Sequence, residues 1–321
     1  MGQKNKDVLY PLRVFHGWLH QRLTINKKEE PLTIDKWPIE KRVEGAMNLY
    51  EKSCGYRFDI NNPETFTEKI IWYKIYYYNP ILTRIVDKYR FKEYIHEKLG
   101  GDEYTLPIYG AYTSIQELKK DWQNLPKEFM LKSNLQSDGF CIKHIPDKDA
   151  VDLEKLLSEL SGWLDVRRTL INSYCRAYYG ATPRIIAEKY AENVAGQLFD
   201  YKAYCFRGNP YCFCASVNHF GEEHYPITYY DCDWNKIDVR SGIHKNDDIP
   251  QPPHLDEMIS ISKVLSSDFP FVRVDFFDTT DQLYLAELTF YPGGGQYQYD
   301  PPSFNKTLGD LFILPKSDTE G

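Results

Sequence analysis

Two apolar segments, FVRVDFF at residues 271–277 and YLAELT at residues 284–289, decide the fold that we expect for this chain. The polar residues 278–281 (DTTD) between them predict a turn, so the two segments should pair as a β-hairpin. Charged or polar side chains alternate with apolar ones along both segments, and alternate residues of a strand point to the same face. We therefore expect one face of the hairpin to carry four polar side chains, those of Arg273, Asp275, Glu287 and Thr289.

An apolar hairpin that carries charges has to give them partners, because an unpaired buried charge is costly. Asp275 and Glu287 next to a guanidinium suit a divalent cation and phosphate oxygens. A glycine run at residues 293–295 follows the second segment. The hairpin therefore predicts nucleotide chemistry, and a buried salt bridge of Arg273 without a function is the alternative.

The bulk composition excludes several classes of protein. The chain has 321 residues and a net charge of −7, which argues against nonspecific binding of nucleic acid. No apolar run approaches about 18 residues, and the first residues lack the apolar centre of a signal peptide, so we expect a cytoplasmic protein. Cys205, Cys212, Cys214 and His219 form a weak zinc candidate, because their spacing is not that of paired zinc knuckles. We expect reduced, buried thiols there.

A second candidate site lies in the middle of the chain. Residues 129–132 (FMLK) predict a short strand that ends in Lys132, and residues 140–143 predict the returning strand. The loop between them, which contains Ser133 and Gly139, suits a flap whose N–H groups surround phosphate oxygens. The alternative is an ordinary polar hairpin loop with a solvated lysine.

Three further segments carry candidate nucleotide ligands. A strand over residues 184–190 ends in Glu188, Lys189 and Tyr190, which suits a hinge that meets adenine through backbone groups. Asp200 and Lys202 share one face of the next strand, where the acid suits ribose hydroxyls and the lysine a phosphate. Lys88 lies on a predicted helix over residues 82–99 and adds a second cation for the phosphates. Taken alone, Asp200 and Lys202 are more typical of an exposed ion-pair ladder, and Lys88 is more typical of a solvated helix face.

Thr65 and Glu68, three residues apart, predict a capped helix start. Helices interleaved with strand–loop–strand units predict an α+β fold with an antiparallel nucleotide-binding sheet. The order of the motifs resembles the ATP-grasp superfamily, and residues 64–295 resemble its TupA-like branch, found among genes for teichuronopeptide and capsular polysaccharide synthesis. The segments that carry the resemblance are 65–69 (TFTEK), 87–89 (DKY), 129–132, 184–190 (RIIAEKY), 200–202 (DYK), 272–275 and 287–295.

The resemblance implies two lobes that hold ATP between antiparallel sheets, after a helical N-terminal region. The expected divisions are residues 1–103 (helical region), 104–190 (small lobe with the flap) and 191–321 (large lobe with the metal site). It also implies roles for individual residues. ATP would contact Lys88, Lys132, Ser133, Gly139, Glu188, Lys189, Tyr190 and Asp200; Mg²⁺ would bind Asp275, Glu287 and Thr289; and Arg273 and Lys202 would act on the transferred phosphoryl group.

The residues at 293–295 would present N–H donors to an acyl oxyanion. Two departures from the family pattern stand out. Thr289 replaces the asparagine of most ATP-grasp enzymes, and residues 174–179 (YCRAYY) replace an Arg-Glu-Trp segment that is typical of the branch. The threonine bears on whether a second Mg²⁺ can bind, and the replaced segment bears on substrate specificity.

The implied function is an ATP-dependent carboxylate–amine ligase that acts through an acylphosphate. By analogy with the branch, the acid would be a uronic acid of a surface polysaccharide or of its sugar-nucleotide precursor, and the amine an amino acid or other small amine. Such a role is compatible with peripheral contact with membrane-bound glycan machinery. The alternatives are a glycosyltransferase or other glycan-modifying enzyme, a kinase, and a noncatalytic nucleotide-binding module.

Overall fold

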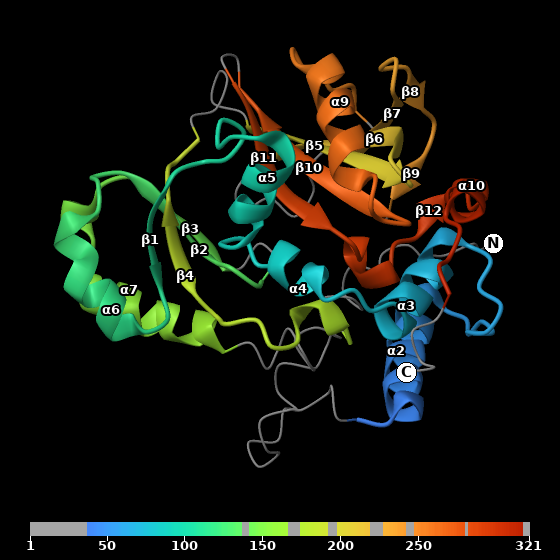
Figure 1. Cartoon of the computed structure of the whole chain (residues 1–321), viewed down its shortest axis with the longest axis horizontal. Helices are drawn as coiled ribbons and strands as arrows, with labels where there is room; N and C mark the ends of the chain where they lie inside the picture. Colours follow the sequence, from blue (N-terminus) through green and yellow to red (C-terminus); the bar gives the residue numbers. More distant parts are fainter. Residues whose placement is uncertain are drawn as a thin grey trace, which may run out of the picture.

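The computed structural model describes residues 37–136, 141–165, 174–191, 198–218, 227–241, 247–279 and 282–316. Its two main sheets have four and six strands, and every strand pair in them is antiparallel. The four-stranded sheet lies on the left of Figure 1 and the six-stranded sheet on the upper right, with helices drawn between and around them. The predicted α+β class with antiparallel sheets is confirmed, whereas the three domain limits stay predictions.

In the described part of the chain, four helices precede the first strand: α2 (Ile39–Cys54), α3 (Phe66–Tyr76), α4 (Ile81–Ile85) and α5 (Phe91–Leu99). Helix α3 begins where its capping residues predict, since the Glu68 carboxylate accepts the N–H of Thr65 at 3.2 Å. Lys69 on the same helix donates to the carbonyls of Gly309 and Phe312 at 2.8 and 3.0 Å. This lysine therefore ties α3 to the last turn of α10 (Ser303–Leu311).

The predicted single helix over residues 82–99 is wrong, because a turn separates α4 from α5. The Asp87 carboxylate accepts the N–H groups of Tyr89 and Arg90 at 2.9 and 3.4 Å. Such local bonds from an aspartate to the backbone compete with helical hydrogen bonds and stabilise turns. Lys88 consequently lies in this turn and not on a helix.

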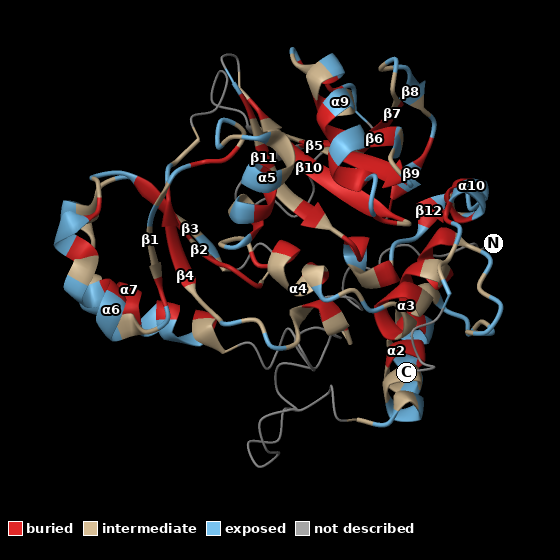
Figure 2. Cartoon of the chain, in the orientation of Figure 1, coloured by how far each residue is buried: buried red, intermediate tan, exposed pale blue. Residues whose placement is uncertain are grey.

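The four-stranded sheet has the order β1 (Ile108–Tyr112), β4 (Ile185–Glu188), β2 (Phe129–Ser133) and β3 (Ile142–Ile145). Helices α6 (Ile115–Asp121) and α7 (Leu153–Leu160) cover one face of it. Buried side chains from these helices, among them Leu118, Leu157 and Leu160, form one apolar core with Leu131 and Ile185 of the strands. Figure 2 shows buried strands beside helices whose outer faces are exposed.

The six-stranded sheet has the order β11 (Leu283–Thr289), β10 (Val272–Asp278), β5 (Leu198–Phe206), β6 (Asn209–Asn218), β7 (Ile227–Asp231) and β8 (Lys236–Ile237). Helix α9 (Leu255–Ser266) packs on it, and a small sheet pairs β9 (Arg240–Ser241) with β12 (Tyr299–Asp300). The predicted hairpin is confirmed as β10 and β11, in which Arg273 pairs with Thr289 and Asp275 with Glu287. The register therefore puts these four residues on one face of the sheet.

Within the described ranges, no helix is both long and apolar enough to cross a membrane. None of the seven cysteines of the chain forms a disulfide bond, and Cys205, Cys212 and Cys214 are buried. Burial raises the pKa of each of these three thiols above its ordinary value. His219, the fourth member of the weak zinc candidate, lies outside the described residues.

Candidate active site

The two carboxylates of the hairpin share a guanidinium and a hydroxyl. Arg273 donates through Nε to Oδ1 of Asp275 at 2.7 Å and through a second nitrogen to Oδ2 at 2.5 Å. The same guanidinium lies 3.8 Å from Glu287. The Thr289 hydroxyl donates to Glu287 at 3.0 Å and lies 3.4 Å from Asp275. The four residues predicted to converge are therefore in direct contact, and we call them the acid-pair cluster.

The two carboxylates differ in their affinity for a proton. Burial raises the pKa of Asp275 to about 7, with Glu287 adding to the effect and the Arg273 guanidinium opposing it. Burial alone would also raise the pKa of Glu287, but Lys88 and Arg273 outweigh it and hold that pKa at about 2. Glu287 is therefore ionised at neutral pH, and a cation that binds beside Asp275 competes with a proton.

Strand β5 adds a lysine to the acid-pair cluster. Lys202 pairs with Asp275 in the sheet register, and its ammonium forms an ion pair with Asp200 on the same strand. Burial would lower the pKa of Lys202, but Asp200 and Asp275 raise it above its ordinary value. The structure thus places Lys202 beside Asp275, and the Asp200 carboxylate is already engaged by Lys202.

Lys88 connects the two sheets. Its Nζ lies 2.9 Å from Glu287 of β11 and donates to the carbonyl of Gln136, beyond β2, at 3.3 Å. Its backbone N–H donates to the carbonyl of Asn134 at 3.1 Å. The turn between α4 and α5 therefore touches the acid-pair cluster on one side and the predicted flap on the other.

Lys132 of β2 forms an ion pair with Glu188 of β4. Glu188 is 3% exposed. Lys92 of α5 lies 2.5 Å from the other oxygen of the same carboxylate. Burial would raise the pKa of Glu188, but the two ammonium groups lower it below its ordinary value. Glu188, the last residue of the inner strand β4, therefore holds two cations.

The remaining predicted nucleotide ligands surround this ion-pair group. The Lys189 N–H donates to the carbonyl of Pro107 at 2.9 Å, and its side chain is exposed. The Tyr190 ring stacks on His144 of β3 with 4.0 Å between centroids. Ser133 is buried, and its hydroxyl accepts the N–H of Leu135 at 3.4 Å. Gly139 lies outside the described residues.

Two residues that position this site were not predicted from the sequence. Asp87 is 1% exposed and pairs at 3.3 Å with Arg184, which precedes β4. Lys92 reaches Glu188 across 96 positions of the chain. The four-residue spacing of Lys88 and Lys92 was the only available signal, since it places two lysines on one face of a helix.

The hairpin residues fit a magnesium ion. Among the described residues, no group of three or more acidic, histidine or cysteine side chains has metal-binding geometry. Mg²⁺ in nucleotide sites, however, commonly uses one or two carboxylates, with phosphates and waters as its other ligands. Asp275 and Glu287 meet this requirement, because they are register partners with the Thr289 hydroxyl between them. These three residues would hold the ion.

The glycine run forms a turn directly after β11. Gly293, Gly294 and Gly295 all have positive φ, between 56° and 77°. A side chain at Gly295 would meet Ile70 and Ile71 of α3 at 3.0–3.1 Å, so the turn lies against that helix. Its predicted role as a donor to an oxyanion stays a prediction.

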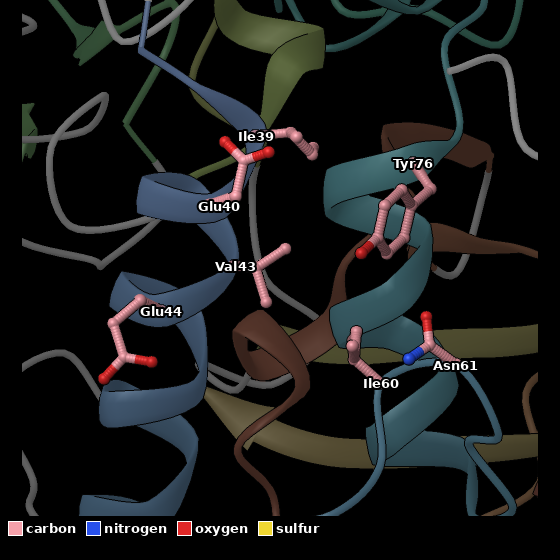
Figure 3. A pocket seen from close by; sticks show the side chains of 7 residues that line it. All are labelled: Ile39, Glu40, Val43, Glu44, Ile60, Asn61 and Tyr76. Atoms are coloured by element: carbon pink, nitrogen blue, oxygen red, sulfur yellow. The ribbon is translucent and has the colours of Figure 1, made fainter. Parts of the chain in front are cut away.

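A separate pocket lies between α2 and α3, away from these groups (Figure 3). It is lined by Ile39, Glu40, Val43, Glu44, Ile60, Asn61 and Tyr76, none of which belongs to the acid-pair cluster or to the lysines around it. Glu44 is already paired with Arg57 at 2.9 Å. This pocket therefore adds nothing to the nucleotide chemistry.

Comparisons with known proteins give the following matches. A family model described as TupA-like ATP-grasp matches residues 68–313. A comparison with curated proteins finds no match. The structure is similar to D-alanine–D-alanine ligase of Bacillus anthracis, with 16% identity, 98% of this chain and 94% of that chain covered, and a TM-score of 0.43. The same enzyme of Helicobacter pylori has 16% identity to this chain and a TM-score of 0.41, and the match covers 78% of this chain and 70% of that chain.

A third similar structure is carboxyaminoimidazole ribonucleotide synthase of Aspergillus clavatus complexed with ATP. The identity is 15%, 68% of this chain is covered, and the TM-score is 0.37. The match spans 46% of that enzyme's length.

Proposed function

The chain belongs to the TupA-like ATP-grasp family, as its motifs predicted, and we propose that it is an ATP-dependent ligase that joins a carboxylate to an amine. The family binds ATP, and the two antiparallel sheets are the lobes of an ATP-grasp fold. The observation that carries the proposal is the position of Lys88, which contacts Glu287 on one sheet and the loop after β2 on the other. A triphosphate placed beside this lysine would be within reach of charges from both lobes.

The proposed reaction has two steps. An oxygen of the acid substrate attacks the γ-phosphorus of ATP, the bond to the β-phosphate oxygen breaks, and an acylphosphate and ADP form. The amine then attacks the acyl carbon, phosphate leaves, and the amine loses one proton as the amide forms. Neither step requires a covalent enzyme intermediate.

Residues of this chain neutralise charge and orient the reacting groups. Lys88, Lys132 and Lys202 would bind phosphate oxygens, and Arg273 would stabilise the phosphoryl group during transfer. Mg²⁺, when bound at Asp275 and Glu287, supplies charge neutralisation for the phosphate oxygens. Lys132 would have to exchange its contact with Glu188 for one with the nucleotide, and Lys92 would then keep Glu188 paired.

For the substrates, we propose a uronic acid of a surface polysaccharide or of its precursor, joined to an amino acid or other small amine. The support is the resemblance of the motifs to the TupA-like branch, whose genes accompany those for teichuronopeptide and capsular polysaccharide synthesis. Magnesium as the metal belongs to the same proposal.

The test is an incubation of the purified protein with ATP, Mg²⁺, D-glucuronate and an amino acid. Formation of ADP and phosphate in equal amounts, dependent on the acid, with an amide of the expected mass would support the ligase. Hydroxylamine in place of the amine should trap the acylphosphate as a hydroxamate. Sugar transfer from a UDP-sugar without ADP formation would identify a glycosyltransferase instead and refute the proposal.

A further inference from the structure

Lys74, near the end of α3, is a buried lysine that has no carboxylate partner among the described residues. The residue is 1% exposed, and its Nζ donates to the carbonyl of Gly294 at 2.8 Å. No other hydrogen-bond or ion-pair partner of this ammonium occurs in the described part of the chain. Burial lowers the pKa of Lys74, and the opposing effect of the Cys175 thiol is too small to restore it. An ammonium in this position is costly unless an anion joins it.

The position of Lys74 relates it to the chemistry proposed above. Gly294 follows β11, which ends at Thr289 of the acid-pair cluster. Five residues of chain span at most about 18 Å, so the Gly294 backbone lies within that distance of Thr289. The same face of α3 supports the neighbouring Gly295 through Ile70. Lys74 is therefore attached to the turn that extends directly from the proposed metal-binding strand.

The space beside Gly294 is bordered by two nitrogen donors. A Cβ built on this glycine would lie 3.4 Å from Nε2 of Gln296 and 3.9 Å from Nζ of Lys74, and no other heavy atom of the described residues lies within 4 Å apart from the chain neighbours. The other end of the Gln296 amide accepts a hydrogen bond from Ser53 at 2.6 Å, which directs Nε2 toward this space. A side chain at position 294 would occupy the space between these two donors, and the φ of 63° disfavours any residue other than glycine there.

We propose that this space, bordered by Gly294, Lys74 and Gln296 and here called the Gly294 cradle, binds a carboxylate of the acid substrate. One cation and one amide donor around an open space match a planar anion with two oxygens and a single charge. The carboxylate would supply the counter-ion that Lys74 lacks. The inference rests on the proposed function, because it assigns the acid of that reaction to the glycine turn.

The rival explanation is that Lys74 only fastens the turn to α3, as a donor to the Gly294 carbonyl. The chain contains a suitable comparison in Lys69, which lies on the same helix and donates to the carbonyls of Gly309 and Phe312. Lys69→Met removes a purely structural ammonium. Lys74→Gln removes the proposed anion ligand but keeps a donor for the Gly294 carbonyl.

The experiment measures binding of D-glucuronate to the protein saturated with Mg²⁺ and a nonhydrolysable ATP analogue, with neutral D-glucose as the comparison probe. We expect Lys74→Gln to weaken D-glucuronate binding at least about tenfold, which corresponds to about 1.4 kcal/mol, while the affinity for the ATP analogue is unchanged. Gly294→Ala should weaken D-glucuronate binding as well, because its methyl group occupies the cradle. Lys69→Met should leave D-glucuronate affinity at the wild-type value.

Three results would overturn the inference: equal D-glucuronate affinity in wild type and Lys74→Gln, an equal loss in Lys69→Met, or no D-glucuronate binding to wild type at millimolar concentration. The ligase proposal can be refuted independently of the Gly294 cradle. Lys74-dependent D-glucuronate binding without ADP formation would support the cradle and oppose the ligase. Ligase turnover with an unchanged KM for the acid in Lys74→Gln would do the reverse.

Discussion

Replacing Glu287 with glutamine removes the negative charge on which the acid-pair cluster depends, with little change in shape. The Glu287 carboxylate lies 2.9 Å from Lys88 and 3.8 Å from Arg273. These cations hold its pKa at about 2, against an ordinary value of 4.5. That difference corresponds to roughly 3 kcal/mol in favour of the ionised carboxylate in the folded protein. We therefore expect Glu287→Gln to lower the free energy of unfolding at pH 7 by up to about 3 kcal/mol.

The sign of the pH dependence follows from the lowered pKa. A carboxylate with a lower pKa in the folded than in the unfolded chain stabilises the fold above the unfolded pKa, and this stabilisation is lost as pH falls toward the folded pKa. The deficit of Glu287→Gln should therefore shrink from about 3 kcal/mol at pH 7 to about 2 kcal/mol at pH 3.5. Urea unfolding followed by tryptophan fluorescence measures both values. An absent deficit, or one of equal size at both pH values, would refute the reasoning.

The same variant tests the metal assignment. Glutamine leaves Lys88 and Arg273 in place but supplies no charge, so one excess positive charge faces the expected magnesium ion. We expect the gain in ATP affinity on adding Mg²⁺ to fall by at least about 100-fold, or about 2.7 kcal/mol. Calorimetric titration with and without the metal measures this gain. The matched control is Glu257→Gln, a carboxylate outside the cluster that also accepts a hydroxyl, from Tyr104 at 2.6 Å. Wild-type metal dependence in Glu287→Gln would exclude Glu287 from the site.

Two further predictions address the other lobe and the core. Lys132→Ala should weaken ATP binding by about 10- to 100-fold, because a charge-assisted hydrogen bond contributes roughly 1.5–3 kcal/mol. A nucleotide titration measures the dissociation constant, and an unchanged value would discredit the flap assignment. Phe271→Ala should lower the free energy of unfolding by about 3–5 kcal/mol, because the ring is fully buried. The centroid of the Phe271 ring lies 5.0 Å from that of Phe66 and 5.1 Å from that of Phe206. A loss under about 1 kcal/mol in urea unfolding would show that the surrounding rings close the space.

Local sequence pattern predicted the elements whose character depends on near neighbours. The hairpin at β10 and β11 follows from alternation, since residues two apart in a strand must share a face. Its polar residues therefore converge as soon as the two strands pair, and the register of Asp275 with Glu287 bears this out. The start of α3 was predictable for the same reason, because a capping residue and its partner are three positions apart.

The predicted helix over residues 82–99 is wrong because Asp87 makes one set of local contacts and one distant contact that helical periodicity does not show. The turn at Asp87 is stabilised by the aspartate's own backbone contacts and by Arg184, which lies 97 positions away in the chain. The helical periodicity of a segment gives no information about a partner so far away in the chain. The consequence for the site is large, since the turn is what lets Lys88 touch both sheets.

The sequence by itself determined which residue types could bind phosphate and metal, and which of them share a strand. The partners of each lysine were decided only by tertiary structure: Lys132 and Lys92 on Glu188, Lys88 on Glu287, and Lys74 on a backbone carbonyl. The physical reason is that ion pairing depends on distances of a few ångströms between side chains. Those distances are fixed by how the two sheets and the N-terminal helices pack, and residues far apart in the chain carry no local pattern that encodes them.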